Sequence, residues 1–182
     1  MKHYNRLTFN RNNIKYYTDD SIMSNNNNTF QSVNSGTTTS SSSVSKDDLI
    51  RGLNEDLARE YKAIIQYVVF SASLKGPEYG DIAEQLKTHA SEELSHALEV
   101  ARQIDYLGGE PTVKGKDAET SDDSKTMLEI DLRAEQDTIM NYRDRIRQAE
   151  TAGEFALSEK LRQIITDEQD HEIDLKDALG IK

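Results

Sequence analysis

Apolar residues recur at alternating spacings of three and four along four long segments of the chain. Positions spaced in this way share one face of an α-helix, so the pattern predicts four amphipathic helices. Their expected bounds are residues 46–74, 81–107, 123–150 and 154–179. Ser45 followed by Asp48 fits a capping box at the start of the first helix, and Gly76-Pro77 ends it.

The connections between these helices differ in length. Thr151–Gly153 is a tight link between the last two helices, whereas the polar segment 110–121 contains Pro111 and Gly115 and can run the length of a bundle. Helices of about 25 residues are about 38 Å long. Short, long and short connections predict an all-α fold, a four-helix bundle with a long crossover between its second and third helices.

Residues 1–45 do not share this pattern. They contain the homopolymer tracts Asn25–Asn28, Thr37–Thr39 and Ser40–Ser43. Such a stretch buries too little apolar surface to offset its chain entropy, so we expect a disordered tail at 1–45 and one domain at 46–182. The first 18 residues hold four basic and no acidic side chains. This is weakly typical of an organellar transit peptide, and a merely polar tail is the alternative.

Composition narrows the possible chemistry. The 182 residues include no Cys, and 33 Asp plus Glu outnumber 22 Lys plus Arg, for a net charge of −11. Without thiolates, a bound metal would need carboxylates and imidazoles. The tail carries +2 and the remainder −13, so the body attracts cations rather than nucleic acid. With no long apolar run and no secretory signal, we expect no membrane association and a cytoplasmic protein, or a mitochondrial or other organellar one if the tail is a transit peptide.

Each predicted helix interrupts its apolar stripe with an acid. The polar members of the stripes are Glu60, Glu93, His96, Glu135, Glu168 and His171, and no stripe contains Lys or Arg. A lone ionised carboxylate removed from water costs several kcal/mol, and facing carboxylates also repel. Any single glutamate could be protonated or turned to solvent, but four together require cations. Two divalent ions would balance four carboxylates.

An internal repeat strengthens this interpretation. Adding 75 to eleven stripe positions of the first two helices reaches positions of the same character in the last two. Glu93 and Glu168 each begin an E-x-x-H motif, and each follows its partner, Glu60 or Glu135, by 33 residues. One E-x-x-H is weak evidence, whereas paired copies within a repeat are strong. We therefore infer two helix hairpins related by a pseudo-twofold axis, each supplying half of a binuclear site.

The motif spacing suggests how the ligands divide. Residues three apart on a helix point the same way, so one Glu can bridge two ions while its His binds one of them. The natural assignment makes Glu93 and Glu168 the bridges. Glu60 and His96 would then hold one metal, and Glu135 and His171 the other.

This constellation resembles the ferritin-like di-iron proteins, and the strings at 59–67 (REYKAIIQY) and 93–97 (ELSHA) are similar to bacterioferritin. The resemblance spans residues 46 to about 180. It implies a ferroxidase with two non-haem irons per chain, which oxidises Fe(II) with dioxygen or hydrogen peroxide and stores ferric mineral in an oligomeric shell. It also implies that Tyr67 supplies an electron beside the site; a core tyrosine hydrogen-bonded to a carboxylate is the alternative.

Two features depart from bacterioferritin, and a third distinguishes the chain from a related group. Leu94 occupies the position of the haem-ligating Met, so we expect no haem. The sequence ends at Lys182, immediately after the fourth predicted helix, so we expect the short fifth helix of that family to be missing. This argues against a 24-subunit homo-oligomer and leaves a 12-subunit one open. The starvation-protection Dps proteins usually place their iron site between subunits, whereas this set lies within one chain.

Other interpretations remain open at this stage. The same ligands serve di-manganese or di-iron enzymes that consume peroxide. A Dps-like protein could bind DNA through four cations of the tail, which are Lys2, Arg6, Arg11 and Lys15, although the acidic body opposes this. A plain structural bundle would leave the buried acids uncompensated. We expect His89 to be a hydrogen-bonded core histidine rather than an extra ligand, and Glu92 to be an exposed helix acid.

Overall fold

The structure is a computed structural model that describes residues 44–181. The chain forms α1 (Lys46–Ser73), the short 3-10 helix η1 (Pro77–Tyr79), α2 (Gly80–Tyr106), α3 (Ser124–Thr151) and α4 (Phe155–Leu179). Each α-helix begins and ends within one residue of its predicted bounds, and the all-α four-helix bundle is confirmed. The turn of 3-10 helix after Gly76 was not predicted. Apart from its last two residues, the tail expected at 1–45 lies outside the described residues.

Local signals explain where the helices begin and end. The Ser45 side chain accepts a hydrogen bond from Asp48 N at 3.1 Å, which confirms the predicted N-cap of α1. Asp123 caps α3 in the same way by accepting from Thr126 N at 2.8 Å. Gly153 and Gly180 follow α3 and α4 with φ of 78° and 66°, a conformation in which glycine is favoured.

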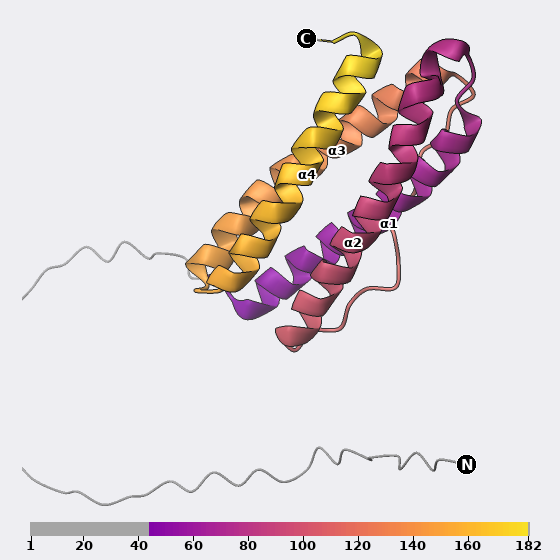
Figure 1. Ribbon diagram of the computed structural model, residues 1–182. Helices are drawn as coiled ribbons and strands as arrows, with labels where there is room; N and C mark the ends of the chain where they lie inside the picture. Colours follow the sequence, from indigo (N-terminus) through magenta and orange to yellow (C-terminus); the bar gives the residue numbers. More distant parts are fainter. Residues whose placement is uncertain (1–43, 182) are drawn as a thin grey trace, which may run out of the picture. The chain divides into compact units, whose positions relative to one another are not determined.

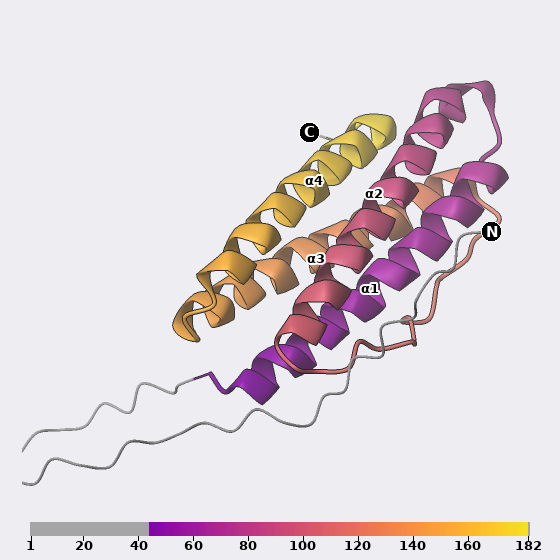
Figure 2. The same cartoon turned by 60° about the horizontal axis from the view of Figure 1, so that its bottom comes forward.

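The helices form two antiparallel hairpins, α1 with α2 and α3 with α4, which pack against each other (Figures 1 and 2). The main contacts between the hairpins join α1 to α3 and α2 to α4, so α1 and α4 lie on one diagonal. The α1–α3 face and the α2–α4 face are therefore opposite sides of the bundle.

The long crossover between α2 and α3 runs along α1 (Figure 2). Three hydrogen bonds from its backbone N–H groups fix it there. Lys116 N donates to Ala58 O at 2.9 Å, Thr112 N to Asn54 Oδ1 at 2.6 Å, and Glu119 N to Gln66 Oε1 at 3.1 Å. The predicted crossover is thus an ordered strap rather than a loose loop.

The apolar core consists of two clusters with a polar layer between them. Along α1, Leu57 belongs to one cluster and Tyr67 to the other, and the buried Glu60 lies between. Along α2, Ala97 and Leu86 flank Glu93 in the same way. The bundle therefore holds its buried acids near the middle of its length. None of the helices among residues 44–181 combines the length and apolarity needed to cross a bilayer.

Candidate metal centre

The six residues singled out by the sequence meet in the middle of the bundle. None of these residues is more than 4% exposed; they are Glu60, Glu93, His96, Glu135, Glu168 and His171. One comes from α1, two from α2, one from α3 and two from α4. Their facing inward follows from the stripe periodicity, because each replaces an apolar residue on the buried face of its helix.

These side chains form two overlapping groups. In one, ligand atoms of Glu60, Glu93, His96 and Glu168 lie within 4.8 Å of one another. In the other, Glu93, Glu135, Glu168 and His171 do the same. Glu93 and Glu168 belong to both groups, which is the arrangement that two ions sharing two bridging carboxylates would require.

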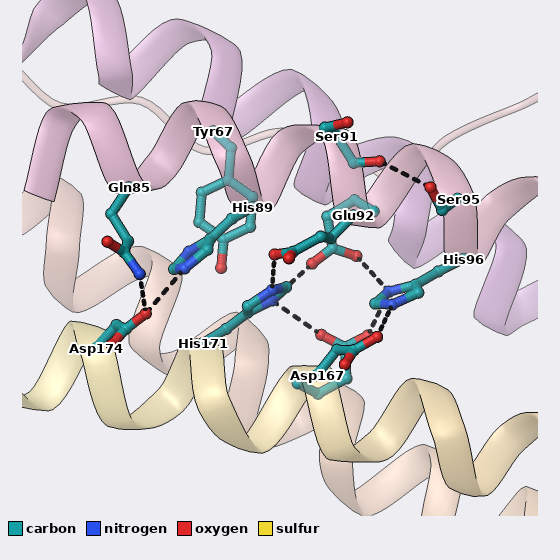
Figure 3. Close-up of polar contacts among 12 residues, drawn as sticks. Tyr67, Gln85, His89, Ser91, Glu92, Ser95, His96, Asp167, His171 and Asp174 are labelled. Atoms are coloured by element: carbon teal, nitrogen blue, oxygen red, sulfur yellow. Dashed lines mark hydrogen bonds and ion pairs between the residues drawn. The ribbon is translucent and has the colours of Figure 1, made fainter.

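Both histidines turn Nδ1 toward the acids. His171 Nδ1 lies 3.0 Å from Glu93 Oε1 and 3.4 Å from Glu168 Oε2. His96 Nδ1 lies 3.4 Å from Glu93 Oε2 and 3.4 Å from Glu168 Oε1. Figure 3 shows the two rings reaching toward one another from α2 and α4. The coordinating nitrogen of each histidine would therefore be Nδ1.

The far nitrogen of each ring contacts a second acid. His171 Nε2 donates to Glu92 at 2.9 Å, and His96 Nε2 donates to Asp167 at 3.1 Å (Figure 3). A carboxylate in this position fixes the tautomer with the proton on Nε2 and makes Nδ1 a better metal ligand. The Glu92 side chain is 44% exposed, so it is a partly exposed helix acid, and in addition it contacts His171.

Two tyrosines complete the layer. The Tyr67 hydroxyl donates to Glu135, and the Tyr142 hydroxyl donates to Glu60. Burial, and then the neighbouring carboxylates, raise the pKa of both phenols well above the usual value, so both keep their protons. Tyr67 thus has the carboxylate hydrogen bond of its alternative interpretation, and Tyr142 makes the equivalent bond in the other half.

Burial and mutual repulsion set the protonation of the metal-free cluster. Burial, then the charge of Glu93, raises the pKa of Glu60 well above normal; burial, then the charge of Glu168, does the same for Glu135. Burial alone would lower the pKa of His171, but its contacts with Glu168 and Glu93 raise it to about 10. The same balance raises the pKa of His96. Burial alone would raise the pKa of Glu93, but its contacts with the two histidines outweigh burial, so its pKa falls. Protons thus supply positive charge that metal ions would replace.

The unpaired atoms of these side chains are suited to binding metal ions. The buried atoms without a hydrogen-bond partner include Glu60 Oε2, Glu93 Oε1, both carboxylate oxygens of Glu168, and Nδ1 of His96 and His171. Unpaired buried polar atoms are costly, and these six belong to residues that converge on one layer. Oxygen and imidazole donors suit iron, manganese or zinc.

The repeat also contained a signal for Asp167 and Tyr142, which the sequence analysis did not single out. Glu92 and Asp167 are 75 positions apart, as are Tyr67 and Tyr142, so the repeat that relates the ligands also relates their hydrogen-bond partners. His89 breaks the repeat. It is 1% exposed, its Nε2 lies 3.2 Å from Asp174, and it stacks on His171 with ring centroids 4.0 Å apart. Its Nε2 bond fits the expected core histidine, but its Nδ1 has no hydrogen-bond partner, and His89, Glu92 and His171 form a third group that could hold a metal ion.

Comparison with known proteins agrees with this geometry. The model of the ferritin-like domain family matches residues 50–181. A bacterioferritin of Desulfovibrio desulfuricans is 34% identical over 128 residues, which span 69% of this chain and 71% of that protein. A ferritin-like diiron-carboxylate protein from Bacillus anthracis has a TM-score of 0.71 at 36% identity, covering 74% of this chain and 96% of its own.

A further solved structure is the dodecameric thioferritin of Bacteroides fragilis, described as a bacterioferritin-related protein. It has a TM-score of 0.67 at 26% identity and covers 76% of this chain and 88% of its own. The family match spans the whole bundle, and the structures share its fold. The chain therefore belongs to the ferritin-like di-iron superfamily, close to the bacterioferritins.

Proposed function

We propose that this protein oxidises Fe(II) to Fe(III) at a paired site within each chain and stores the ferric product in an oligomeric shell. The observation that carries the proposal is the convergence of four buried glutamates and two buried histidines whose facing atoms lack partners. Membership of a superfamily of iron-storage proteins supports it.

Iron is the substrate, and the chain supplies its binding site. Two Fe(II) ions give up one electron each, enough to reduce one dioxygen to hydrogen peroxide or one hydrogen peroxide to water. Glu60 and His96 would hold one ion, Glu135 and His171 the other, and Glu93 and Glu168 both. Carboxylate oxygens favour the ion of higher charge, so this ligand set favours oxidation.

The surrounding residues orient the metal-binding side chains and fix where the histidines carry their protons. For Nδ1 to bind a cation, each imidazole must lose the proton on that atom, while the proton on Nε2 stays on the bond to Glu92 or Asp167. The two tyrosine hydroxyls hold Glu135 and Glu60 in place by donating to them. The apolar clusters close off the polar layer from water along the length of the bundle. That Tyr67 supplies an electron is part of the proposal.

The ligand assignment is tested by Glu93→Ala and His171→Ala. Each variant should lose the rapid phase of Fe(II) oxidation in stopped-flow absorbance, because a bridging or terminal ligand is gone. Circular dichroism should show that each keeps its helices. Glu84→Ala, which removes an exposed acid from the same helix as Glu93, is the matched control and should oxidise iron at the wild-type rate. Wild-type rates in the ligand variants would refute the assignment.

Several earlier expectations remain predictions. Leu94 lies on α2 and is half-exposed, and we still expect no haem from that position. DNA binding by the cations of the tail concerns residues outside the described range, as does targeting to an organelle. Metal titration decides whether the site prefers iron over manganese, and a comparison of dioxygen with hydrogen peroxide as oxidant tests the alternative of a di-manganese or di-iron enzyme that consumes peroxide.

A further inference from the structure

A second feature of the bundle is a cavity of about 290 Å³ between α1 and α3 that reaches the candidate metal centre. Its floor includes the carboxyl groups of Glu60, Glu93 and Glu135. Three cationic side chains also line it, namely Arg59 and Lys62 of α1 and Lys116 of the crossover. It gives an outside molecule a route to the acids from the face opposite α2 and α4.

Apart from the three floor carboxylates, one acid, Asp137, lines this cavity, whereas three cations line it. The acids that pair with the cations do not line it. Lys62 Nζ lies 3.3 Å from Glu119, and Lys116 pairs with Glu55. Counting the floor, the lining has four acids and three cations, so it would present net positive charge only once cations bound at the metal centre neutralise the three floor carboxylates.

Arg59 has a hydrogen-bond donor to spare. It pairs with Asp56, but Asp56 also accepts from Arg145 Nε at 2.6 Å, so one carboxylate serves two guanidinium groups. Arg59 Nε is buried and has no hydrogen-bond partner. A buried unpaired N–H is costly, and an anion in the cavity could satisfy it.

The opposite face has the reverse character. A cavity of about 360 Å³ between α2 and α4 is lined by Glu92, Asp167, Asp170 and Asp174, and by no Lys or Arg. The rings of His89 and His171 also line it. Charges of one sign in a cleft attract ligands of the other sign, so the two faces should attract different ions.

We propose that the α1–α3 cavity is a binding site for a small oxyanion of the phosphate class, held by Arg59, Lys62 and Lys116 above the metal centre. The inference rests on the proposed function, because two divalent ions are needed to neutralise the floor carboxylates. The volume lies at the small end of ligand pockets, which suits inorganic phosphate rather than a nucleotide. Lys116 is placed over the cavity by the bond from its backbone N–H to Ala58 O.

The test titrates inorganic phosphate into the full-chain protein loaded with Zn²⁺, which does not undergo redox chemistry, and follows the heat of binding. We expect one phosphate per chain, and weaker binding to the metal-free protein because its floor repels anions. Arg59→Gln and Lys116→Gln should each weaken phosphate binding by about tenfold, because each removes a charge-assisted bond.

Arg102→Gln is the matched control. Arg102 is an exposed cation of α2 paired with Glu99 at 2.7 Å, so its loss changes the net charge equally but should leave phosphate affinity unchanged. Zn²⁺ stoichiometry is measured first for each protein. Two Zn²⁺ per chain with no phosphate binding, or with wild-type phosphate affinity in both cavity variants, would overturn the oxyanion site alone. Failure of the wild type to bind Zn²⁺ would overturn the proposed function and this inference with it.

Discussion

Two buried aspartates show how the repeat breaks at the level of single residues. Asp56 and Asp131 are 75 positions apart and are 1% and 2% exposed. Asp56 accepts from Arg145, whereas the position equivalent to Arg145 in the other half is Phe70. Asp131 has instead a bond from Gln66 Nε2 at 2.9 Å, and its second oxygen has no partner. Burial raises the pKa of Asp131 to about 7 despite the Gln66 bond.

This pKa makes stability depend on pH. Because the folded-state pKa is raised, the contribution of Asp131 to stability is fully present below its unfolded value and is lost as pH rises through about 7. The Asn side chain of Asp131→Asn cannot ionise, so the variant does not lose this stability as the pH rises. Its side-chain oxygen can still accept the hydrogen bond from Gln66. In urea denaturation of metal-free protein, the advantage of the variant should grow by on the order of 2 kcal/mol between pH 5 and pH 8.

The control for Asp131→Asn is the same substitution at an exposed aspartate. Asp122→Asn removes an exposed carboxylate and should give the same difference from wild type at both pH values. An Asp131→Asn advantage that stays constant with pH would show that Asp131 is ionised in the folded state.

At the level of elements, the crossover depends on two amide side chains of α1. Asn54 accepts from Thr112 N at 2.6 Å and donates to Glu110 O at 3.2 Å. Gln66 accepts from Glu119 N near the other end. These bonds replace the regular backbone pairing that an extended segment outside a sheet lacks.

Asn54→Ala should therefore loosen the crossover. The variant leaves Thr112 N without its acceptor, and the free energy of unfolding should fall by about 1–3 kcal/mol. Hydrogen exchange of the Thr112 amide should speed up, while amides within α1 keep their protection. Asn141→Ala is the control, because the Asn141 side chain bonds within its own helix to Asp137 O. Unchanged exchange at Thr112 in Asn54→Ala would contradict the anchoring role.

The elements also show what sequence reasoning can reach. Helix bounds were predictable because Gly76-Pro77 and the glycines after α2, α3 and α4 interrupt clear stripes. The six metal-facing residues were predictable because they recur at a fixed offset. A carboxylate bond from Tyr67 was one of two interpretations that the sequence left open. The use of Nδ1, the bond from Tyr142 and the anchors of the crossover could not be predicted, because they depend on side-chain rotamers and on how the hairpins pack. Arg145 was missed for the same reason, since its partner Asp56 is 89 residues away.

For the whole molecule, the proposed shell requires surfaces that bind other copies. Several large apolar side chains are exposed on the first hairpin; they include Ile65 at 50%, Val68 at 55%, Leu94 at 50% and Leu98 at 66%. Exposed apolar residues of this kind often mark interaction surfaces. The dodecameric relative from Bacteroides fragilis shows that one protein of this fold assembles in that number.

Light scattering on the purified protein tests the assembly. Twelve chains of 20.6 kDa would give a particle of about 250 kDa, and a shell of 24 about twice that mass. Leu94→Lys should shift the population to smaller species, because it places a charge on an apolar face. Val113→Lys, at a 92% exposed crossover position, is the control and should assemble normally. A monomeric wild type would contradict storage in a shell.

The division of the ligands between the two hairpins has a final consequence. The group around His96 takes Glu168 from the second hairpin, and the group around His171 takes Glu93 from the first. Each bound ion would therefore cross-link the two halves of the bundle, so that they could separate only after giving up both ions. Iron loading and the cooperativity of unfolding are thereby coupled, because bound iron should stabilise the folded bundle against separation of its two hairpins.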